Sequence, residues 1–475
     1  MTGPVLAVDQ GTSGTKALVV CPERGVIGAG FAEVRPRHLS GGLVEVDPEE
    51  LHSSVVEAGR RALAEAREPV VALGLANQGE TVLAWDPATG RPLTTALVWQ
   101  DRRAESVCAE LAPHAGELRA LTGLPLDPYF AAPKMAWIRR HLTREGVVTT
   151  TDAWLVHRLT GAYVTDAATA SRTQLLDLDR AQWSPRALDL YGLTGERLPG
   201  IVGNAQPVGA TQEFGPEIPV AGLAVDQQAA LLAQSVTAPG GAKCTYGTGA
   251  FLLAHTGDAP RRGSSGLVSC IAWNLAGRTS YCLDGQVYTA ASAVRWLTDL
   301  GVIKGAADLD AVGGSVPDSG GVTFVPALAG LAAPWWRGDL RGSLTGLGLD
   351  TTAGHLVRAL CEGIAAQVAE LVDALDSPLE TLRVDGGLTR SALLMQTQAD
   401  LLQRPVEVSA LPDATALGVA ALARLGTEPG QKVTEVLPEW RPSAVYTPRI
   451  TSDQAAARRA RFRAEVTALL DRTPA

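Results

Sequence analysis

Three observations predict an α/β fold with two domains. The chain has 475 residues, and a domain usually holds ~100–200. Short apolar runs alternate with helical segments in both halves of the chain, which is typical of α/β architecture. Each half also opens on the same unit, in which a Gly/Thr-rich turn joins two apolar runs, at residues 5–20 and again at residues 242–255. We therefore expect two related domains, at residues 1–236 and 237–475.

The first half begins with a predicted β-hairpin. Its apolar runs at residues 5–8 and 17–20 are separated by the turn-forming sequence QGTSGT. A helix is expected at residues 48–66, with Asp47 as its N-cap. The other elements expected in this half are strands at 70–76, 82–85, 96–99 and 220–225 and helices at 101–111, 133–141, 151–159 and 227–235.

The second half repeats this opening. Residues 242–246 and 251–255 form the second expected hairpin, and the turn Gly-Thr-Gly lies between them. The further elements expected here are a strand at 381–384, helices at 289–300, 353–375, 391–402 and 415–424, and a charged helix after Thr451. Alternating strands and helices in both halves favour the α/β class.

Composition excludes several classes of protein. Hydrophobic residues make up 46% of the chain and charged residues 19%, which is an ordinary globular composition. The net charge is −9 and no basic stripe interleaved with aromatic residues is present, so we expect no nucleic-acid partner. The six cysteines form no Cys-x-x-Cys pair and are expected to be reduced and mostly buried. The N-terminus does not resemble a signal peptide and no apolar run reaches about 18 residues, so we expect a cytoplasmic protein without a membrane span.

The pentapeptide Leu-Ala-Val-Asp-Gln occurs twice, at residues 6–10 and 223–227. Each copy ends an apolar run with an aspartate, Asp9 or Asp226. Asp9 precedes the first Gly/Thr turn, where an aspartate can organise Mg²⁺ or cap the turn. Asp226 lies where a strand meets the next helix, where it can accept a proton from a hydroxyl group or serve as the helix N-cap. The sequence alone supports the two interpretations of Asp226 equally.

The two Gly/Thr turns are candidate phosphate sites. The sequence QGTSGTK at residues 10–16 can aim backbone amides and hydroxyls at one anion, and Lys16 adds a positive charge. It is not a Walker A loop, because the G-x-x-x-x-G-K-[ST] pattern is absent. Either turn alone is an ordinary hairpin turn, but the equivalent sequence TYGTG at residues 245–249 favours a phosphate clasp with two sides. The glycines of Asp385-Gly386-Gly387 allow close approach to a flat ligand such as an adenine, or simply form a strand-to-helix turn.

Long, collinear stretches covering nearly the whole chain resemble the FGGY family of carbohydrate kinases. They are VDQGTSGTKALVV (8–20), GLVEVDPEE (42–50), LANQGET (75–81), LVWQDRR (97–103), TGLPLDPYFAAPKMAWI (122–138), TDAWLVHRLTG (151–161), ATASRTQLLDLDRAQW (168–183), AGLAVDQQAALLAQ (221–234), KCTYGTGAFLL (243–253), RVDGGLTRSALLMQTQADLLQRPVEV (383–408) and ATALGVAALA (414–423). The resemblance implies two ribonuclease-H-like domains of the actin, hexokinase and Hsp70 type, with a catalytic cleft between them. It also implies transfer of a phosphoryl group from ATP, with Mg²⁺, to a terminal hydroxyl of a small polyol. The first expected acceptor is glycerol. The resemblance also implies that the protein forms a homodimer or a homotetramer.

The resemblance also implies site residues at matching positions. Asp226 would be the catalytic base, and Asp9 would organise Mg²⁺. The side chains implied to line the polyol site are Glu80, Trp99, Tyr129, Asp226, Gln227 and Phe251. The residues implied to meet ATP are Thr12, Ser13, Gly14, Lys16, Gly247, Thr248, Ala291, Arg295, Gly387 and Ser391. The last set departs from the family at positions 291, 295 and 391, where Gly, Gln and Asn are usual, so some ATP contacts are expected to differ.

Gly79 is the departure that bears on the acceptor. Family members that act on glycerol read Asn-Gln-Arg-Glu-Thr where this chain reads Asn-Gln-Gly-Glu-Thr, and that arginine hydrogen-bonds polyol hydroxyls. Its loss predicts weak glycerol binding or a site for a longer polyol or a ketose, unless Arg102 or Arg103 supplies the donor.

Two interpretations lie outside the class of small-molecule kinases. An ATPase of the actin or Hsp70 type would not need the aromatic residues Trp99, Tyr129 and Phe251 beside Glu80. A catalytically inactive sensor would not need both aspartates.

Overall fold

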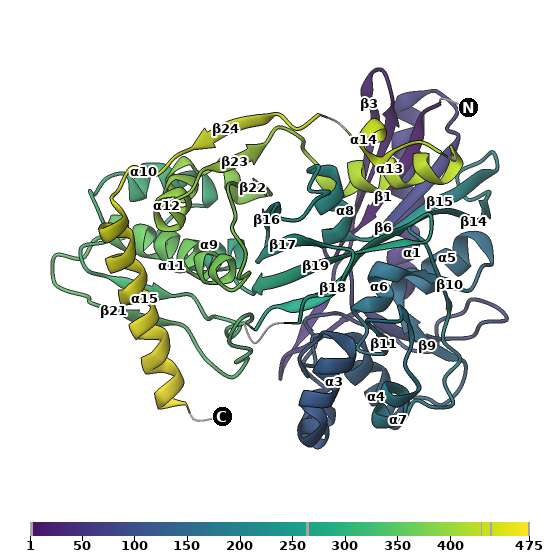
Figure 1. Cartoon of the computed structure of the whole chain (residues 1–475), viewed down its shortest axis with the longest axis horizontal. Helices are drawn as coiled ribbons and strands as arrows, with labels where there is room; N and C mark the ends of the chain where they lie inside the picture. Colours follow the sequence, from purple (N-terminus) through teal and green to yellow (C-terminus); the bar gives the residue numbers. More distant parts are fainter. Residues whose placement is uncertain (1–2, 263–265, 429, 438, 474–475) are drawn as a thin grey trace.

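The computed structural model describes residues 3–262, 266–428, 430–437 and 439–473 and shows two α/β domains (Figure 1). The first domain is built on a six-stranded sheet in the order β14-β15-β6-β1-β2-β3. Neighbours are antiparallel from β1 to β3, whereas β1, β6 and β15 run parallel. The strands of this sheet are β1 (Val5–Gln10), β2 (Gly14–Cys21), β3 (Gly25–Glu33), β6 (Ala72–Asn77), β14 (Ala205–Thr211) and β15 (Ile218–Val225).

The second domain repeats this arrangement in a seven-stranded sheet, in the order β18-β19-β17-β16-β22-β23-β24. Its strands are β16 (Ala242–Tyr246), β17 (Ala250–Gly257), β18 (Val268–Leu275), β19 (Arg278–Val287), β22 (Leu382–Asp385), β23 (Val406–Ser409) and β24 (Pro442–Tyr446). The hairpin β16–β17 is antiparallel and β16, β22 and β23 run parallel, as in the first sheet. The hairpin β16–β17 therefore occupies the place of β1–β2, which confirms the predicted repeat.

Helices cover both sheets and bury their apolar faces there, which supplies most of the driving force for folding. α1 (Pro48–Ala66) has the predicted bounds, because the Asp47 carboxylate accepts a hydrogen bond from the Glu49 amide and starts the helix. The helices of the second domain are α9 (Ala291–Asp299), α10 (Leu309–Gly313), α11 (Ala353–Asp373), α12 (Ala392–Leu402) and α15 (Ser452–Arg472).

A smaller sheet and several short helices extend the first domain. The strands of this sheet are β4 (Arg37–Leu39), β5 (Leu43–Val46), β7 (Val82–Trp85), β8 (Ala96–Leu97) and β9 (Val147–Thr150). The helices are α2 (Glu105–Leu111), α3 (Ala115–Thr122), α4 (Ala131–His141), α5 (Thr151–Thr160), α6 (Ala167–Ser171) and α7 (Pro185–Tyr191). Short two-stranded ladders complete the fold: β10 (Val164–Asp166) with β13 (Gly200–Val202), β11 (Leu176–Asp177) with β12 (Gln182–Trp183), and β20 (Thr323–Val325) with β21 (Ser343–Thr345).

Helix α13 (Ala414–Thr427) belongs to the second half of the chain but packs on β1, β6 and β15 of the first sheet, beside α8 (Asp226–Ala233) (Figure 1). Glycines allow this contact. A Cβ atom at Gly418 would lie 1.9 Å from the carbonyl oxygen of Ala229, and one at Gly222 would lie 2.4 Å from the amide nitrogen of Ala423. The domain boundary after residue 236 therefore stays a prediction, and it divides the chain by sequence alone. In space, α13 lies with the first sheet.

In the two large sheets, the sequence pattern missed strands β3, β14, β18, β19, β23 and β24. β19 mixes Ser, Tyr, Asp, Gly and Gln with apolar residues, so its alternation is weak. β18 is held from the first domain, where the Gly123 carbonyl accepts from the Ser269 amide and the Ser171 hydroxyl accepts from the Ile271 amide, both at 3.0 Å. Among the residues that the structure describes, no helix is long and apolar enough to cross a membrane.

Candidate active site between the two domains

The first sheet brings the two aspartates to one edge. Asp9 lies opposite Ala76 on β6, and Ala76 lies opposite Ala224 on β15. Asp226 follows two residues later as the first residue of α8. The two copies of the repeated pentapeptide are therefore parallel, two strands apart, and both end at the edge where α/β sheets bind their ligands.

Asp9 lies where a negative charge is unfavourable. Burial and the carboxylate of Asp226 raise the pKa of Asp9 to about 7, and Lys16 opposes this shift. Within the described part of the chain no hydrogen-bond donor reaches the Asp9 carboxylate. A divalent cation would relieve the repulsion and bring this pKa down, so the chemistry of Asp9 fits Mg²⁺.

Asp226 is placed to act on a hydroxyl group. The N-cap of α8 is Val225, so the N-cap interpretation of Asp226 is wrong. The Asp226 Oδ1 instead accepts a hydrogen bond of 2.7 Å from the Gln227 amide. Burial raises the pKa of Asp226, while the Gln227 amide, Lys243 and Arg172 hold it down. A carboxylate with a raised pKa is a better proton acceptor.

Lys243 on β16 supports Gln227 from the second domain. Its ammonium group is fully buried and donates to Gln227 Oε1 at 2.5 Å and to Thr245 Oγ1 at 2.8 Å. Burial lowers the pKa of Lys243, and nearby carboxylates oppose the shift. Since its carbonyl oxygen is held by Lys243, Gln227 is oriented next to Asp226.

The first Gly/Thr turn joins β1 to β2. The Gly11 amide donates to the Gly14 carbonyl at 3.0 Å and closes the turn. The Thr12 hydroxyl accepts a hydrogen bond of 2.9 Å from Trp99 Nε1, whereas Ser13 is exposed. This turn therefore connects the predicted phosphate residues to the predicted acceptor residues.

Lys16 connects the same hairpin to the second half of the chain. It lies opposite Asp9 in the hairpin and forms an ion pair with Asp413, the residue before α13. The Lys16 and Asp413 side chains are 41% and 25% exposed, so water reaches the pair. A phosphate oxygen can therefore compete with Asp413 for this ammonium group.

The second Gly/Thr turn is built on the start of α9. The Ala290 amide donates to the Thr248 carbonyl at 2.9 Å, and the Ala291 amide donates to the Gly247 carbonyl at 3.1 Å. Arg295 follows one helical turn after Ala291. The structure thus brings four of the predicted nucleotide residues to one place.

Two consecutive glycines follow β22 beside this turn. Gly386 has a φ of +96°, and a Cβ atom there would lie 2.4 Å from the Tyr246 carbonyl oxygen, so only glycine fits. A Cβ atom at Gly387 would have no neighbour within 4 Å among the described residues. Gly386 therefore holds the turn, and Gly387 leaves space beside it.

Ser391 is occupied by the protein itself. Its hydroxyl donates to Asp310 Oδ1 at 2.6 Å, and it accepts from the Leu394 amide as the N-cap of α12. A contact between this side chain and ATP stays a prediction.

Three predicted acceptor-site rings lie together. The ring centroids of Trp99 and Tyr129 are 5.6 Å apart at 67°, and those of Trp99 and Phe251 are 6.3 Å apart at 81°, which are edge-to-face arrangements. Trp99 and Tyr129 belong to the first domain and Phe251 to β17. The cluster therefore depends on the approach of the two domains.

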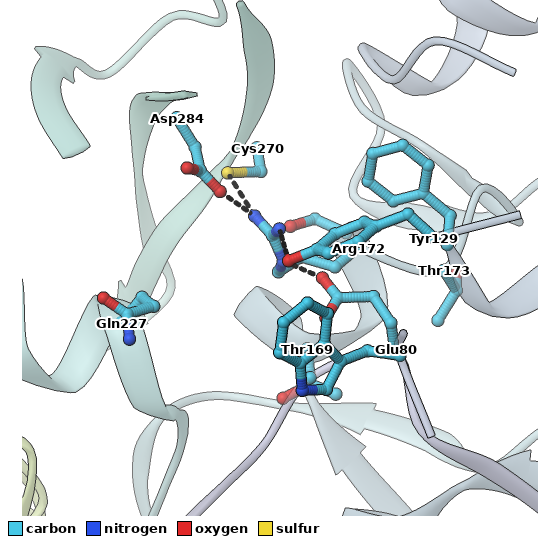
Figure 2. A network of polar contacts seen from close by, with 12 residues as sticks. Glu80, Tyr129, Thr169, Arg172, Thr173, Gln227, Cys270 and Asp284 are labelled. Atoms are coloured by element: carbon cyan, nitrogen blue, oxygen red, sulfur yellow. Dashed lines mark hydrogen bonds and ion pairs between the residues drawn. The ribbon is translucent and has the colours of Figure 1, made fainter. Parts of the chain in front are cut away.

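Glu80 combines a strained backbone with a buried charge. Its φ is +58°, and the Thr81 amide donates to the Gly79 carbonyl at 2.8 Å, which makes a γ-turn centred on Glu80. The side chain is 4% exposed and forms an ion pair with Arg172 (Figure 2). Burial raises the pKa of Glu80, and the Arg172 charge lowers it.

Lys134 holds the segment that carries Tyr129. The buried ammonium group donates to the carbonyls of Pro128, Tyr129 and Phe130 at 2.8, 2.6 and 2.7 Å. Burial lowers the pKa of Lys134 to about 8. Three carbonyls that converge on one cation fix this turn, and with it the position of the tyrosine ring.

Sequence reasoning missed Lys134 and Arg172, although both lie in stretches that resemble the family. The available signal was a charged residue inside a run of small and apolar ones, as in AATASRT. The two arginines that the sequence offers as alternative donors form other ion pairs, since Arg102 pairs with Glu105 and Arg103 with Asp101.

A repeated α/β domain with two aspartates and two Gly/Thr turns beside an aromatic cluster defines a class, the two-domain small-molecule kinases. Comparison with known proteins agrees. Residues 4–233 match the N-terminal domain of the FGGY family of carbohydrate kinases, and residues 242–426 match its C-terminal domain. The chain belongs to this family.

Relatives match over nearly the full length. A glycerol kinase of Aromatoleum aromaticum is 42% identical over 97% of this chain and 98% of its own. A glycerol kinase of Gloeobacter violaceus is 43% identical over 90% of this chain and 89% of its own. The crystal structure of Plasmodium falciparum glycerol kinase with ADP superposes with a TM-score of 0.89 at 30% identity, covering 99% of this chain and 98% of that one.

Proposed function

We propose that this protein is a glycerol kinase, which transfers the γ-phosphoryl group of ATP to a terminal hydroxyl of glycerol and forms glycerol 3-phosphate. The observation that carries the proposal is that relatives named glycerol kinase are similar over about nine tenths or more of both chains. Further support is that, besides burial, the charge of Asp226 raises the pKa of both Glu80 and Tyr129, so Asp226 lies close to these predicted acceptor residues.

The acceptor side provides a base and a binding surface. Asp226 accepts the proton of the attacking hydroxyl, and Gln227 beside it orients the acceptor. Glu80 accepts hydrogen bonds from the other hydroxyls, and the rings of Trp99, Tyr129 and Phe251 cover the carbon chain. A positioned general base of this kind usually contributes ~10²–10⁴-fold to the rate.

The nucleotide side provides positive charge and close backbone approach. Phosphoryl transfer passes through a loose transition state, so positioning and charge neutralisation matter most. The residues proposed to meet ATP are Thr12, Ser13, Gly14, Lys16, Gly247, Thr248, Ala291, Arg295, Gly387 and Ser391.

Asp9 is the residue proposed to hold Mg²⁺, because its carboxylate has a raised pKa and lacks a donor among the described residues. Mg²⁺ usually takes one or two carboxylates and completes its shell with phosphate oxygens and water. When bound, the ion neutralises charge that develops on the phosphates.

The charges of the site favour a neutral, hydroxyl-rich acceptor. Glu80, Asp226 and Asp284 all lie near Arg172, and the two buried lysines nearby already donate their hydrogen bonds to protein oxygens. An acceptor that carries its own carboxylate would be repelled.

The surroundings of Gly79 do not favour a longer acceptor. A Cβ atom at this residue would lie 3.0 Å from Val225 Cγ2 and 3.7 Å from Arg172 Nε. The space directly beside Gly79 is therefore occupied.

The test is ATP-dependent phosphorylation of glycerol, dihydroxyacetone, erythritol, xylitol, ribitol, several ketoses and gluconate, each measured as kcat/KM. We expect glycerol to have the highest value and gluconate to be inactive. A longer acceptor that exceeds glycerol by tenfold, about 1.4 kcal/mol of transition-state discrimination, would contradict the glycerol assignment. ATP hydrolysis at the same rate with and without any polyol would contradict the kinase itself.

A further inference from the structure

A single guanidinium group joins the two domains at the acceptor site. Arg172 directly follows α6 and is 4% exposed. Its Nε forms an ion pair with Glu80 of the first domain, and its Nη1 forms one with Asp284 on β19 of the second. Figure 2 shows Arg172 between these two carboxylates. The bridge forms only when the domains are together.

The same guanidinium reaches further groups of the site. Its Nη1 lies 3.7 Å from Cys270 Sγ, and its Nη2 lies 3.4 Å from the Tyr129 hydroxyl. The Arg172 Cζ atom also lies 5.9 Å from the centre of the Tyr129 ring, on its face. Two of the predicted acceptor residues, Glu80 and Tyr129, therefore depend on one side chain.

Gly79 shows why this arginine matters in this chain. A side chain at position 79 would begin within 3.9 Å of both Arg172 Nε and Arg172 Cδ. Gly79 has no side-chain hydrogen-bond donor, whereas the planar guanidinium group of Arg172, which has several donors, lies beside it. An arginine can hold two carboxylates in fixed directions at once, which a lysine cannot do.

The second domain also offers acceptor atoms at this place. Asp284 Oδ1 and Gln286 Oε1 are buried, and no donor within the described residues reaches either of them. Gln286 lies opposite Phe251 in the sheet, so these oxygens lie next to the aromatic cluster. Buried acceptors of this kind need donors, and hydroxyl groups such as those of a polyol are donors of the required kind.

We propose that Arg172 is a positioning residue for the acceptor, which fixes Glu80 through a bridge to Asp284 and so makes tight polyol binding depend on the approach of the two domains. The inference rests on the proposed function. Arg172 acts through Glu80 and Tyr129 and leaves the nucleotide side unchanged.

The test compares Arg172→Lys, Arg172→Gln, Asp284→Asn and the double variant Arg172→Lys/Asp284→Asn with the full-length wild type. The matched control is Arg103→Lys, because the Arg103 side chain is only 8% exposed and also pairs with two carboxylates, Asp101 and Glu45, but lies outside the site. Each protein is measured for glycerol KM and kcat, ATP KM, ATP hydrolysis without acceptor, and Tm.

We expect Arg172→Lys to raise the glycerol KM by about thirtyfold or more and Asp284→Asn by about tenfold, because a charged donor is misplaced or released. The double variant should be no worse than Arg172→Lys, because Asp284 acts through the arginine. ATP KM and ATP hydrolysis without acceptor should stay within threefold. Arg103→Lys should lower Tm and leave the glycerol KM unchanged.

A glycerol KM within threefold of wild type in both Arg172 variants would overturn the inference, as would equal losses toward glycerol and ATP. A wild type that prefers another polyol would contradict the glycerol assignment alone, because the same variants would then raise the KM for that polyol. A wild-type rate that depends on no added polyol would contradict both.

Discussion

The acceptor side and the nucleotide side of the candidate site are formed by different kinds of groups. The acceptor side consists of buried side chains that hold one another, with Arg172 between Glu80 and Asp284 and with Lys134 under Tyr129. The nucleotide side consists of backbone turns that pack through glycines and helix ends.

This difference indicates which substitutions each side tolerates. A buried ion network responds to a change of one charge, because every remaining partner is left in a medium that solvates it poorly. A glycine turn is insensitive to charge and responds to an added Cβ atom.

The largest effect is expected at Asp226. Asp226→Asn keeps the size of the side chain but cannot take a proton, so kcat should fall by ~10²–10⁴-fold while ATP binding is retained. Steady-state kinetics and ATP titration measure the two properties. Asp189→Asn, at an exposed carboxylate on α7, is the control and should be unchanged. Turnover near the wild-type rate would remove the role of Asp226 as base.

The next largest effect is expected on the nucleotide side, at Gly386. Gly386→Ala forces a Cβ atom against the Tyr246 carbonyl at a positive φ, so ATP KM should rise at least tenfold and the free energy of unfolding should fall by roughly 3 kcal/mol. Gly387→Ala is the matched control, since its Cβ atom meets nothing in the described protein, and its Tm should not change. Equal losses of stability in both variants would contradict the assigned roles.

Lys134→Met should weaken the acceptor side without touching the nucleotide side. Three buried carbonyls lose their donor, so the free energy of unfolding should fall by about 3 kcal/mol and the glycerol KM should rise about tenfold. Thermal unfolding and kinetics with both substrates measure this. A rise in ATP KM as large as that in glycerol KM would show that the two sides are not separate.

The lowered pKa of Lys134 also predicts that the free energy of unfolding depends on pH. Burial lowers the pKa of Lys134 from 10.5 to about 8. Between these values the unfolded chain keeps a proton that the folded protein has released, so the contribution of Lys134 to the free energy of unfolding rises with pH across this window. Urea unfolding at pH 7.5 and pH 10 should therefore show a difference between wild type and Lys134→Met that grows with pH. A constant difference would mean that Lys134 titrates normally.

The smallest effect is expected where the two halves meet through an exposed pair. Asp413→Asn removes the partner of Lys16, and an ion pair as exposed as this one contributes ~0–1 kcal/mol to stability. Tm should barely change, and ATP KM should fall about twofold, because Lys16 no longer has a competing carboxylate. An increased ATP KM would indicate that Asp413 itself supports the nucleotide.

Local signals predicted the parts of the fold that local chemistry controls. The bounds of α1 were correct because Asp47 caps it, and both hairpins were correct because a glycine-rich turn lies between two apolar runs. Strands β18 and β19 were missed because the first domain covers them, which no pattern within those residues reveals. The N-cap interpretation of Asp226 failed because the preceding residue, Val225, takes that place.

The sequence by itself determined the repeated α/β architecture, the two aspartates at strand ends and the two Gly/Thr turns, since periodicity and turn chemistry act over a few residues. Only the tertiary structure decided how the charges pair. Arg172 is 92 residues from Glu80 and 112 from Asp284, and the three groups are buried together only because the two domains meet there. The pairing of buried charges depends on distance in space and on the exclusion of water. Neither can be read from the order of the residues in the sequence.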